Sequence, residues 1–340
     1  KPFMGIALLE SGKITQNTVI PAPGAWSIPG SRHLFRDSVR RGHGSANLSK
    51  AIQVSSDTFF YRLGYEMGID KASPKLAEFG FGSITGIDLP NEYRGVLPSR
   101  EWKAKRFAKS ENKAAREWMP GEMVSVSIGQ GYNAYTPLQM AHATASLANN
   151  GVVYQPHLAK ELLNYGSREI TRINPNPAKT IPFKKDNFEY VKRAMEKVLQ
   201  PGGTAHRIGG GLAYSMGGKT GTAQVVQIKQ GRSYNAAALA ERHRDHAWFI
   251  SFAPLEKPEI AIAVLLENGG WGASAAPLAR SLTDFYMLNL KQGIQPPAEN
   301  ISGGRHTERS IMAPTVFQTA YGINANADAE STAASAVQGE

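Results

Sequence analysis

The sequence predicts an α+β fold, with helices in the first part of the chain and an antiparallel sheet in the last part. Three observations lead to this class. Apolar residues recur at helical spacing up to about residue 200. Glycines then crowd residues 202–221, and strand-length apolar segments follow them. The last two of these segments are joined by residues 254–258, a connection of hairpin length.

Five helices are expected before the sheet. In the first, Phe3, Ile6 and Leu9 recur at helical spacing. Pro137 stands in the first turn of a later helix, where its missing N–H would have no partner anyway. Residues 20–46 are rich in Pro, Gly and Arg and predict an irregular segment. The predicted helices cover residues 3–12, 48–66, 71–79, 137–149 and 187–199.

Three strands and a closing helix are expected in the last part of the chain. The strands cover residues 219–227, 246–253 and 259–266, and the helix covers residues 274–290. We expect one domain over residues 1–292. From about Pro296 the chain holds few apolar residues and much Ala, Ser, Asn and Thr, which predicts a disordered tail over residues 293–340.

Composition excludes several classes. The chain has no cysteine, so disulfides and cysteine–zinc sites are excluded. Its longest apolar run, residues 260–266, is far shorter than the roughly 18 residues of a membrane span. The net charge is +10, and cations gather within residues 32–41 and 100–116. Glutamates interleave the second group, which favours a solvated face, and no nucleic-acid motif accompanies either. We therefore expect no nucleic-acid partner.

Two polar motifs stand about 160 residues apart. Residues 219–222 read Lys-Thr-Gly-Thr on a predicted strand. A phosphate-binding loop fails on spacing, because Ala213 stands where the pattern needs a glycine. An edge strand can instead pair with an extended peptide through its backbone. The second motif, Ser55-Ser56-Asp57, precedes an aromatic run and by itself indicates only a polar helix turn.

Together the motifs carry a resemblance. Lys-Thr-Gly and Ser-x-Asn/Asp are two of the three motifs of penicillin-recognising serine enzymes, and Lys1 matches the lysine that ends the third, Ser-x-x-Lys. Over residues 1–292 the chain resembles the transpeptidase domain of class B penicillin-binding proteins of the elongation type. This implies a penicillin-binding/β-lactamase-like fold, an antiparallel sheet flanked by helices. The supporting segments follow the family's order: residues 54–61, 85–89, 128–132, 136–140, 218–224, 244–246 and 267–270.

The resemblance implies a peptidoglycan D,D-transpeptidase. Such an enzyme cross-links peptidoglycan stem peptides through a serine acyl-enzyme and is inhibited by β-lactams. Lys1 would be the general base, and Ser55 would relay a proton to the leaving amine. Asp57 stands where many relatives have Asn. Lys219 would place positive charge near the base and near the substrate carboxylate.

The same resemblance assigns substrate contacts to the Lys-Thr-Gly-Thr segment. Thr220 and Thr222 would offer hydroxyls to the substrate carboxylate. Gly221, which has no Cβ, would let the ligand approach the backbone closely. The backbone N–H of Thr222 would be one donor of an oxyanion hole.

The resemblance also places the nucleophile outside these 340 residues, on a serine three positions before Lys1. The first strands of the fold would be absent too, so we expect this fragment to be poorly folded alone and inert toward acylation. The intact protein would lie at the periplasmic face of the bacterial inner membrane. Its partners would be a membrane glycan polymerase and rod-shape scaffold proteins.

We expect no metal and no cofactor. Some relatives hold zinc with two Asp, one His and one Cys. Asp37 and His43 match two of those positions, while Ala22 and Ser56 occupy the others. Two ligands do not make a structural zinc site. A local hydrogen bond or a solvated loop is the preferred interpretation of the pair.

Two alternatives stay open. A penicillin-recognising hydrolase, either a D,D-carboxypeptidase or a β-lactamase, needs a water-activating group, and no segment clearly supplies one. A non-catalytic penicillin-fold sensor would lack the serine three positions before Lys1. The presence of Lys1, Ser55 and Lys219 favours an enzyme over a sensor.

Overall fold

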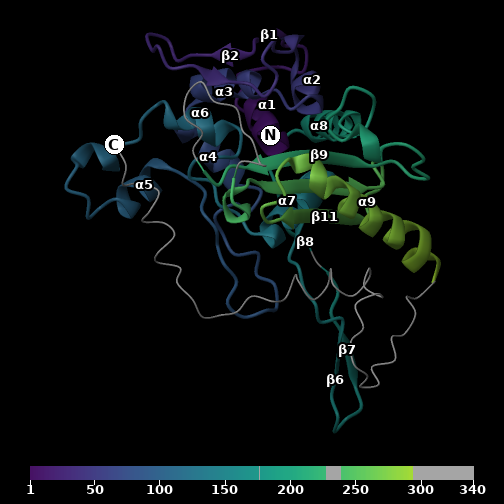
Figure 1. Ribbon diagram of the computed structural model, residues 1–340. Helices are drawn as coiled ribbons and strands as arrows, with labels where there is room; N and C mark the ends of the chain where they lie inside the picture. Colours follow the sequence, from purple (N-terminus) through teal and green to yellow (C-terminus); the bar gives the residue numbers. More distant parts are fainter. Residues whose placement is uncertain (176, 227–238, 294–340) are drawn as a thin grey trace. The chain divides into compact units, whose positions relative to one another are not determined.

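A computed structural model describes residues 1–175, 177–226 and 239–293 (Figure 1). The mixture of helices and antiparallel strands confirms the α+β class. The α-helices are α1 Pro2–Glu10, α2 Leu48–Gln53, α3 Asp57–Met67, α4 Ile69–Ala77, α5 Arg100–Arg106, α6 Glu122–Ser127, α7 Pro137–Ala148, α8 Lys185–Lys197 and α9 Ala276–Asp284. The strands are β1 Ile20–Ala22, β2 Ala25–Trp26, β3 Phe35–Arg36, β4 Gly44–Ala46, β5 Val152–Tyr154, β6 Glu161–Leu163, β7 Ile170–Arg172, β8 Pro177–Thr180, β9 Gly217–Ala223, β10 His246–Ala253 and β11 Ile260–Leu266.

The main sheet is antiparallel and has the strand order β11-β10-β9. Trp248 in the central strand pairs with Gly221 on one side and with Leu265 on the other. Helices α7 and α9 pack against β10 and β11, and α8 packs against β9 (Figure 1). Within the described residues β9 pairs only with β10, so the Lys-Thr-Gly-Thr segment lies on an edge strand, as predicted.

The helix predicted over residues 48–66 is wrong as a single element. The structure divides it into α2 and α3, and Ser55 between them has a φ of +58°. A left-handed residue cannot continue a right-handed helix. Ser56 then caps α3, because its side chain accepts a hydrogen bond from the Phe59 N–H.

Other elements differ from the prediction at their ends or were missed. Strand β9 stops at Ala223, and residues 227–238 lie outside the described residues. The closing helix α9 passes into a π turn, Phe285–Asn289. The irregular segment over 20–46 contains four short strands, and helices α5 and α6 were not predicted. Beyond Gly293 the predicted tail lies outside the described residues, so the domain boundary remains a prediction.

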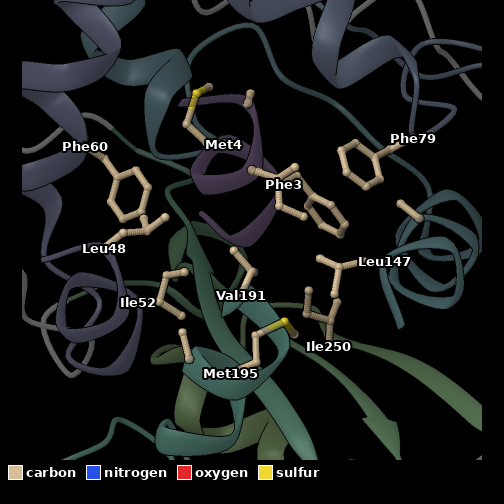
Figure 2. Packing of buried hydrophobic residues seen from close by; sticks show 14 of the residues in the cluster. Phe3, Met4, Leu48, Ile52, Phe60, Phe79, Leu147, Val191, Met195 and Ile250 are labelled. Atoms are coloured by element: carbon tan, nitrogen blue, oxygen red, sulfur yellow. The ribbon is translucent and has the colours of Figure 1, made fainter. Parts of the chain in front are cut away.

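Helix α1 lies in the middle of the hydrophobic core rather than on its surface. All of its residues from Pro2 to Leu9 are buried, and it packs against α2, α3, α4 and α8. This location explains why its apolar residues occupy every face of the helix. Figure 2 shows the surrounding cluster, in which the labelled side chains are Phe3, Met4, Leu48, Ile52, Phe60, Phe79, Leu147, Val191, Met195 and Ile250.

None of the helices in the described ranges combines the length and the apolar character needed to cross a membrane.

Candidate active site

Three elements bring a serine hydroxyl between two lysines. Lys1 lies at the start of α1, Ser55 in the turn between α2 and α3, and Lys219 on β9. The Oγ atom of Ser55 is 2.9 Å from Lys1 Nζ and 2.8 Å from Lys219 Nζ. Lys1 Nζ also donates to the carbonyl oxygen of Ser55, at 2.8 Å. The structure thus brings together three residues that are far apart in the sequence.

The backbone holds Ser55 in an unfavourable conformation. Its φ of +58° is uncommon for any residue other than glycine. The turn is fixed on both sides, since the N–H of Ser55 donates to Ile52 and that of Ser56 donates to Ala51. Backbone strain that persists in this way is concentrated at functional sites.

Asp57 faces Lys1 from the first turn of α3. Its Oδ1 atom lies 2.5 Å from Lys1 Nζ, and both side chains are largely buried. A carboxylate is favoured at a helix N-terminus, where it meets the positive end of the helix dipole. The site therefore contains two lysine side chains and one carboxylate around a single hydroxyl.

Lys219 is a buried cation. Only 4% of the residue is exposed, and its Nζ donates to the Thr220 carbonyl oxygen at 2.7 Å as well as to Ser55. Burial lowers the pKa of Lys219 well below its usual value, and the charge of Lys1 acts in the same direction. Asp57 opposes both effects. Lys219 therefore loses its proton at a lower pH than an exposed lysine does.

The rest of the Lys-Thr-Gly-Thr segment is tied to its surroundings. Thr220 Oγ1 lies 2.7 Å from Thr204 Oγ1. Thr222 Oγ1 accepts the N–H of Gly272 at 3.0 Å, and the Thr222 carbonyl accepts from Gln130 Nε2 at 3.1 Å. A hydroxyl already holding a backbone N–H remains free to donate its own proton.

Gly272 is required by its packing against Gly221. A Cβ atom on Gly272 would collide with the carbonyl oxygen of Gly221, so the missing side chain of Gly272 allows β9 and the segment 272–275 to approach each other. Sequence reasoning missed Gly272 and Gln130. The glycines around Trp271 and those flanking Gln130 were the available signal.

Asp37 and His43 form a buried hydrogen-bond network. His43 Nε2 lies 3.1 Å from Asp37 Oδ1, and Asp37 is 3% exposed, so the solvated-loop interpretation is wrong and the local hydrogen bond is confirmed. The other carboxylate oxygen accepts from Ser56 Oγ at 3.2 Å and from the N–H groups of Asp57 and Thr58 at 2.8 and 3.3 Å. Asp37 thus caps α3 and holds the Ser55–Asp57 turn in place.

The pKa of Asp37 reflects these bonds. Burial alone would raise it, but the N–H of Val39, the charge of His43 and the N–H of Thr58 together bring it below its usual value. Among the residues that the structure describes, no three His, Cys, Asp or Glu side chains gather as metal ligands would.

The basic group within residues 100–116 is only partly a solvated face. Lys103 is 3% exposed and forms an ion pair with Glu122 at 2.5 Å. Tyr132 donates to the same carboxylate at 2.8 Å, and its ring packs among aromatic side chains. These neighbours are Trp102, Phe107 and Trp118.

The comparisons with known proteins define the class. Residues 1–284 match the family described as "Penicillin binding protein transpeptidase domain". The chain belongs to this family. It is similar to the peptidoglycan D,D-transpeptidase MrdA of Acinetobacter baumannii, with 45% identity over 310 residues, which are 90% of this chain and 44% of that protein. With MrdA of Escherichia coli K12 the identity is 40% over 301 residues, 88% of this chain and 46% of that protein.

Solved structures give the same family and fold. Pseudomonas aeruginosa PBP2 in complex with WCK 5153 superposes with a TM-score of 0.71 at 35% identity, covering 89% of this chain and 62% of that one. Helicobacter pylori PBP2 in complex with MreC gives a TM-score of 0.68 at 34% identity, covering 85% and 48%. The chain spans about half the length of the curated relatives it matches.

Proposed function

We propose that this domain is the catalytic domain of a peptidoglycan D,D-transpeptidase that β-lactams inhibit. The observation that carries the proposal is the Ser55 hydroxyl within 3 Å of both Lys1 Nζ and Lys219 Nζ, beside an edge strand with the Lys-Thr-Gly-Thr sequence. This arrangement supports proton transfer next to a place where an extended peptide can pair. Family membership supports the choice of reaction.

The proposed first half-reaction forms an acyl-enzyme. A serine three positions before Lys1 in the complete protein attacks the carbonyl of the penultimate D-alanine of a donor stem peptide. Lys1 takes the serine proton. As the C–N bond breaks, Ser55 gives its hydroxyl proton to the departing amine and takes the proton that Lys1 received, and D-alanine leaves.

In the second half-reaction the acyl group moves to another stem peptide. An amine of that peptide attacks the ester carbonyl, a new amide bond forms, and the serine recovers its proton as the C–O bond breaks. The same base and relay, Lys1 and Ser55, serve both halves with the direction of proton transfer reversed. Asp57 keeps Lys1 in position through its contact at 2.5 Å.

The proposed substrate contacts lie on β9. The donor peptide pairs with the free edge of the strand, and Lys219, Thr220 and Thr222 attract its terminal carboxylate. The N–H of Thr222 is one oxyanion donor. Because Gly221 has no Cβ, the peptide can lie close against the strand backbone.

We further propose the location and the partners of the complete protein. It lies at the periplasmic face of the inner membrane and works with a rod-shape scaffold protein and a membrane glycan polymerase. Support comes from a PBP2 solved with MreC and from a peptidoglycan synthase complex that coordinates polymerization and crosslinking, which is 28% identical with a TM-score of 0.68.

The decisive test is covalent labelling of the complete protein by a fluorescent penicillin, read by intact mass. We expect one adduct on the serine three positions before Lys1, and no adduct in the Lys1→Ala variant. A folded protein that never labels would favour the sensor. Rapid loss of the adduct to water, with no transfer to an added stem peptide, would favour the hydrolase.

A further inference from the structure

A cavity of about 610 Å³ lies beside the candidate active site. Its walls come from Val39, from residues 41–44, from Val54, and from the loop of residues 202–204. Val54 immediately precedes Ser55, and Thr204 at the cavity wall is hydrogen-bonded to Thr220 at 2.7 Å. The cavity therefore adjoins the part of the site where Thr220 is proposed to meet a substrate carboxylate.

The cavity lining is basic. Arg41 and His43 are its ionisable residues, and no acidic side chain is among them. His43 is engaged with the buried Asp37 at 3.1 Å. Arg41 is exposed, and within the described part of the chain its guanidinium forms no ion pair or side-chain hydrogen bond. A guanidinium is always charged and presents five donors suited to a carboxylate.

Another part of the cavity wall is the loop of residues 202–204, which neighbouring segments hold in place. A Cβ atom on Gly203 would collide with the carbonyl oxygen of Val198, so the loop packs tightly against the end of α8. The N–H of Thr204 donates to the Gln53 carbonyl at 3.3 Å. Polar contacts then continue into the site, because Thr220 Oγ1 also lies 3.3 Å from Lys219 Nζ. The hydrogen-bonding groups of Lys219, Thr220 and Thr204 thus form a continuous series from the active site to the cavity.

We propose that Arg41 and Thr204 form an anion subsite at this end of the cleft, and that it takes a carboxylate of the substrate. The proposal rests on the proposed function and extends it to a residue outside the family motifs. The carboxylate has two possible sources. One is the terminal carboxylate of the donor stem, which β-lactams carry in equivalent form. The other is a carboxylate of the second stem peptide.

The test uses the complete protein and its Arg41→Gln variant, with Arg40→Gln as the matched control, since Arg40 is an exposed neighbour outside the cavity lining. Two rates are measured. The first is acylation by a penicillin and by its methyl ester, which lacks the anionic charge. The second is transfer of the acyl group to a stem peptide. A charge-assisted hydrogen bond corresponds to about a tenfold change in rate.

A donor carboxylate predicts that Arg41→Gln slows acylation by the penicillin about tenfold but leaves the ester unchanged. An acceptor carboxylate predicts unchanged acylation and about tenfold slower transfer. In either case Arg41→Lys restores part of the rate. The proposal is overturned if Arg41→Gln matches Arg40→Gln in both rates, or if it slows penicillin and ester equally. An unmodified protein that is never acylated would instead overturn the proposed function.

Discussion

Ser55 is held by contacts that leave its hydroxyl little freedom. Its Oγ lies between two lysine Nζ atoms, and its backbone is in the left-handed region. A hydroxyl in this position can accept a proton from one group and donate to another without moving its oxygen. The strained turn, rather than the identity of the residue alone, gives the hydroxyl this position.

Removing this hydroxyl tests the proton relay. We expect Ser55→Ala to lower the acylation rate of the complete protein by penicillin at least about 100-fold, since positioned proton transfer contributes about that much or more. Stopped-flow or gel-based labelling measures the rate. Ser45→Ala, at an exposed position on β4, is the control and is expected to label normally. Equal rates in both variants would remove Ser55 from the mechanism.

The buried Lys219 is expected to destabilise the fold at neutral pH. Its pKa is lowered in the folded state, so the unfolded chain binds more protons between the folded-state pKa and about 10.4. The free energy of unfolding therefore rises with pH across that window. Lys219→Met is expected to stabilise the protein by about 1–3 kcal/mol at pH 7 while abolishing labelling.

Melting temperatures at pH 7 and pH 10 measure this effect. The difference between Lys219→Met and the unmodified protein should shrink as the pH rises, because Lys219 then loses its charge in both states. Lys184→Met, at an exposed position, should show no such trend. A constant difference across this pH range would contradict the buried-charge explanation.

At the scale of elements, Asp37 connects the segment 20–46 to the start of α3. Its carboxylate holds the N–H groups of Val39, Asp57 and Thr58. Asp37→Ala leaves these donors unsatisfied, and we expect the free energy of unfolding to fall by about 2–3 kcal/mol. Denaturant unfolding followed by circular dichroism measures the change.

The control for Asp37 is Asp70→Ala. Asp70 forms an exposed ion pair with Arg100, whose loss should cost under about 1 kcal/mol. A similar midpoint for the two variants would mean that Asp37 does not hold the turn. Because the pKa of Asp37 is lowered on folding, its contribution is present above the unfolded-state pKa and is lost as the pH falls through the folded-state value.

Elements with a clear period could be predicted from the sequence, and those set by distant contacts could not. For α7, β10 and β11, the periodic apolar pattern predicted the first and last residues to within a residue or two of those observed. The break at Ser55 was missed, because the aromatic run after it continues the helical period while Asp37, from a remote segment, fixes the turn. The short helix α5 was missed too, since its seven residues carry too little periodicity.

The site was predicted unevenly for the same reason. The motifs and the family resemblance identified Lys1, Ser55 and Lys219, which the structure brings together. Composition and spacing alone did not reveal that Thr204 contacts Thr220 or that Gly272 packs on Gly221, because those contacts join segments that share no local pattern.

At the scale of the whole molecule, the edge of β11 that does not face β10 is where we expect another chain to associate. In the described residues β11 pairs only with β10, and all seven of its residues are apolar. An unpaired apolar edge is a template for association with another chain. We expect the 340-residue chain, produced alone, to be poorly folded or to self-associate.

Light scattering against concentration measures this association. Replacing Leu265, a partly buried residue of β11 that is not among those packed against the core cluster, with lysine should reduce it, because a charge on an edge strand opposes pairing. Lysine at Ala240, which lies outside the strands, is the control. A monodisperse, cooperatively folding 340-residue chain would contradict the prediction.

The central position of α1 has a consequence for the order of folding. Phe3 belongs to the same core cluster as Met195, and α1 packs against α8 as well as against α2, α3 and α4, so its burial is complete only after a segment nearly 200 residues later has been synthesised. Contacts of such long sequence separation slow folding. A ribosome would therefore have to synthesise the chain as far as Lys197 before α1 could bury the face that packs against α8. During that interval part of the apolar surface of the helix that follows Lys1 would stay exposed to water.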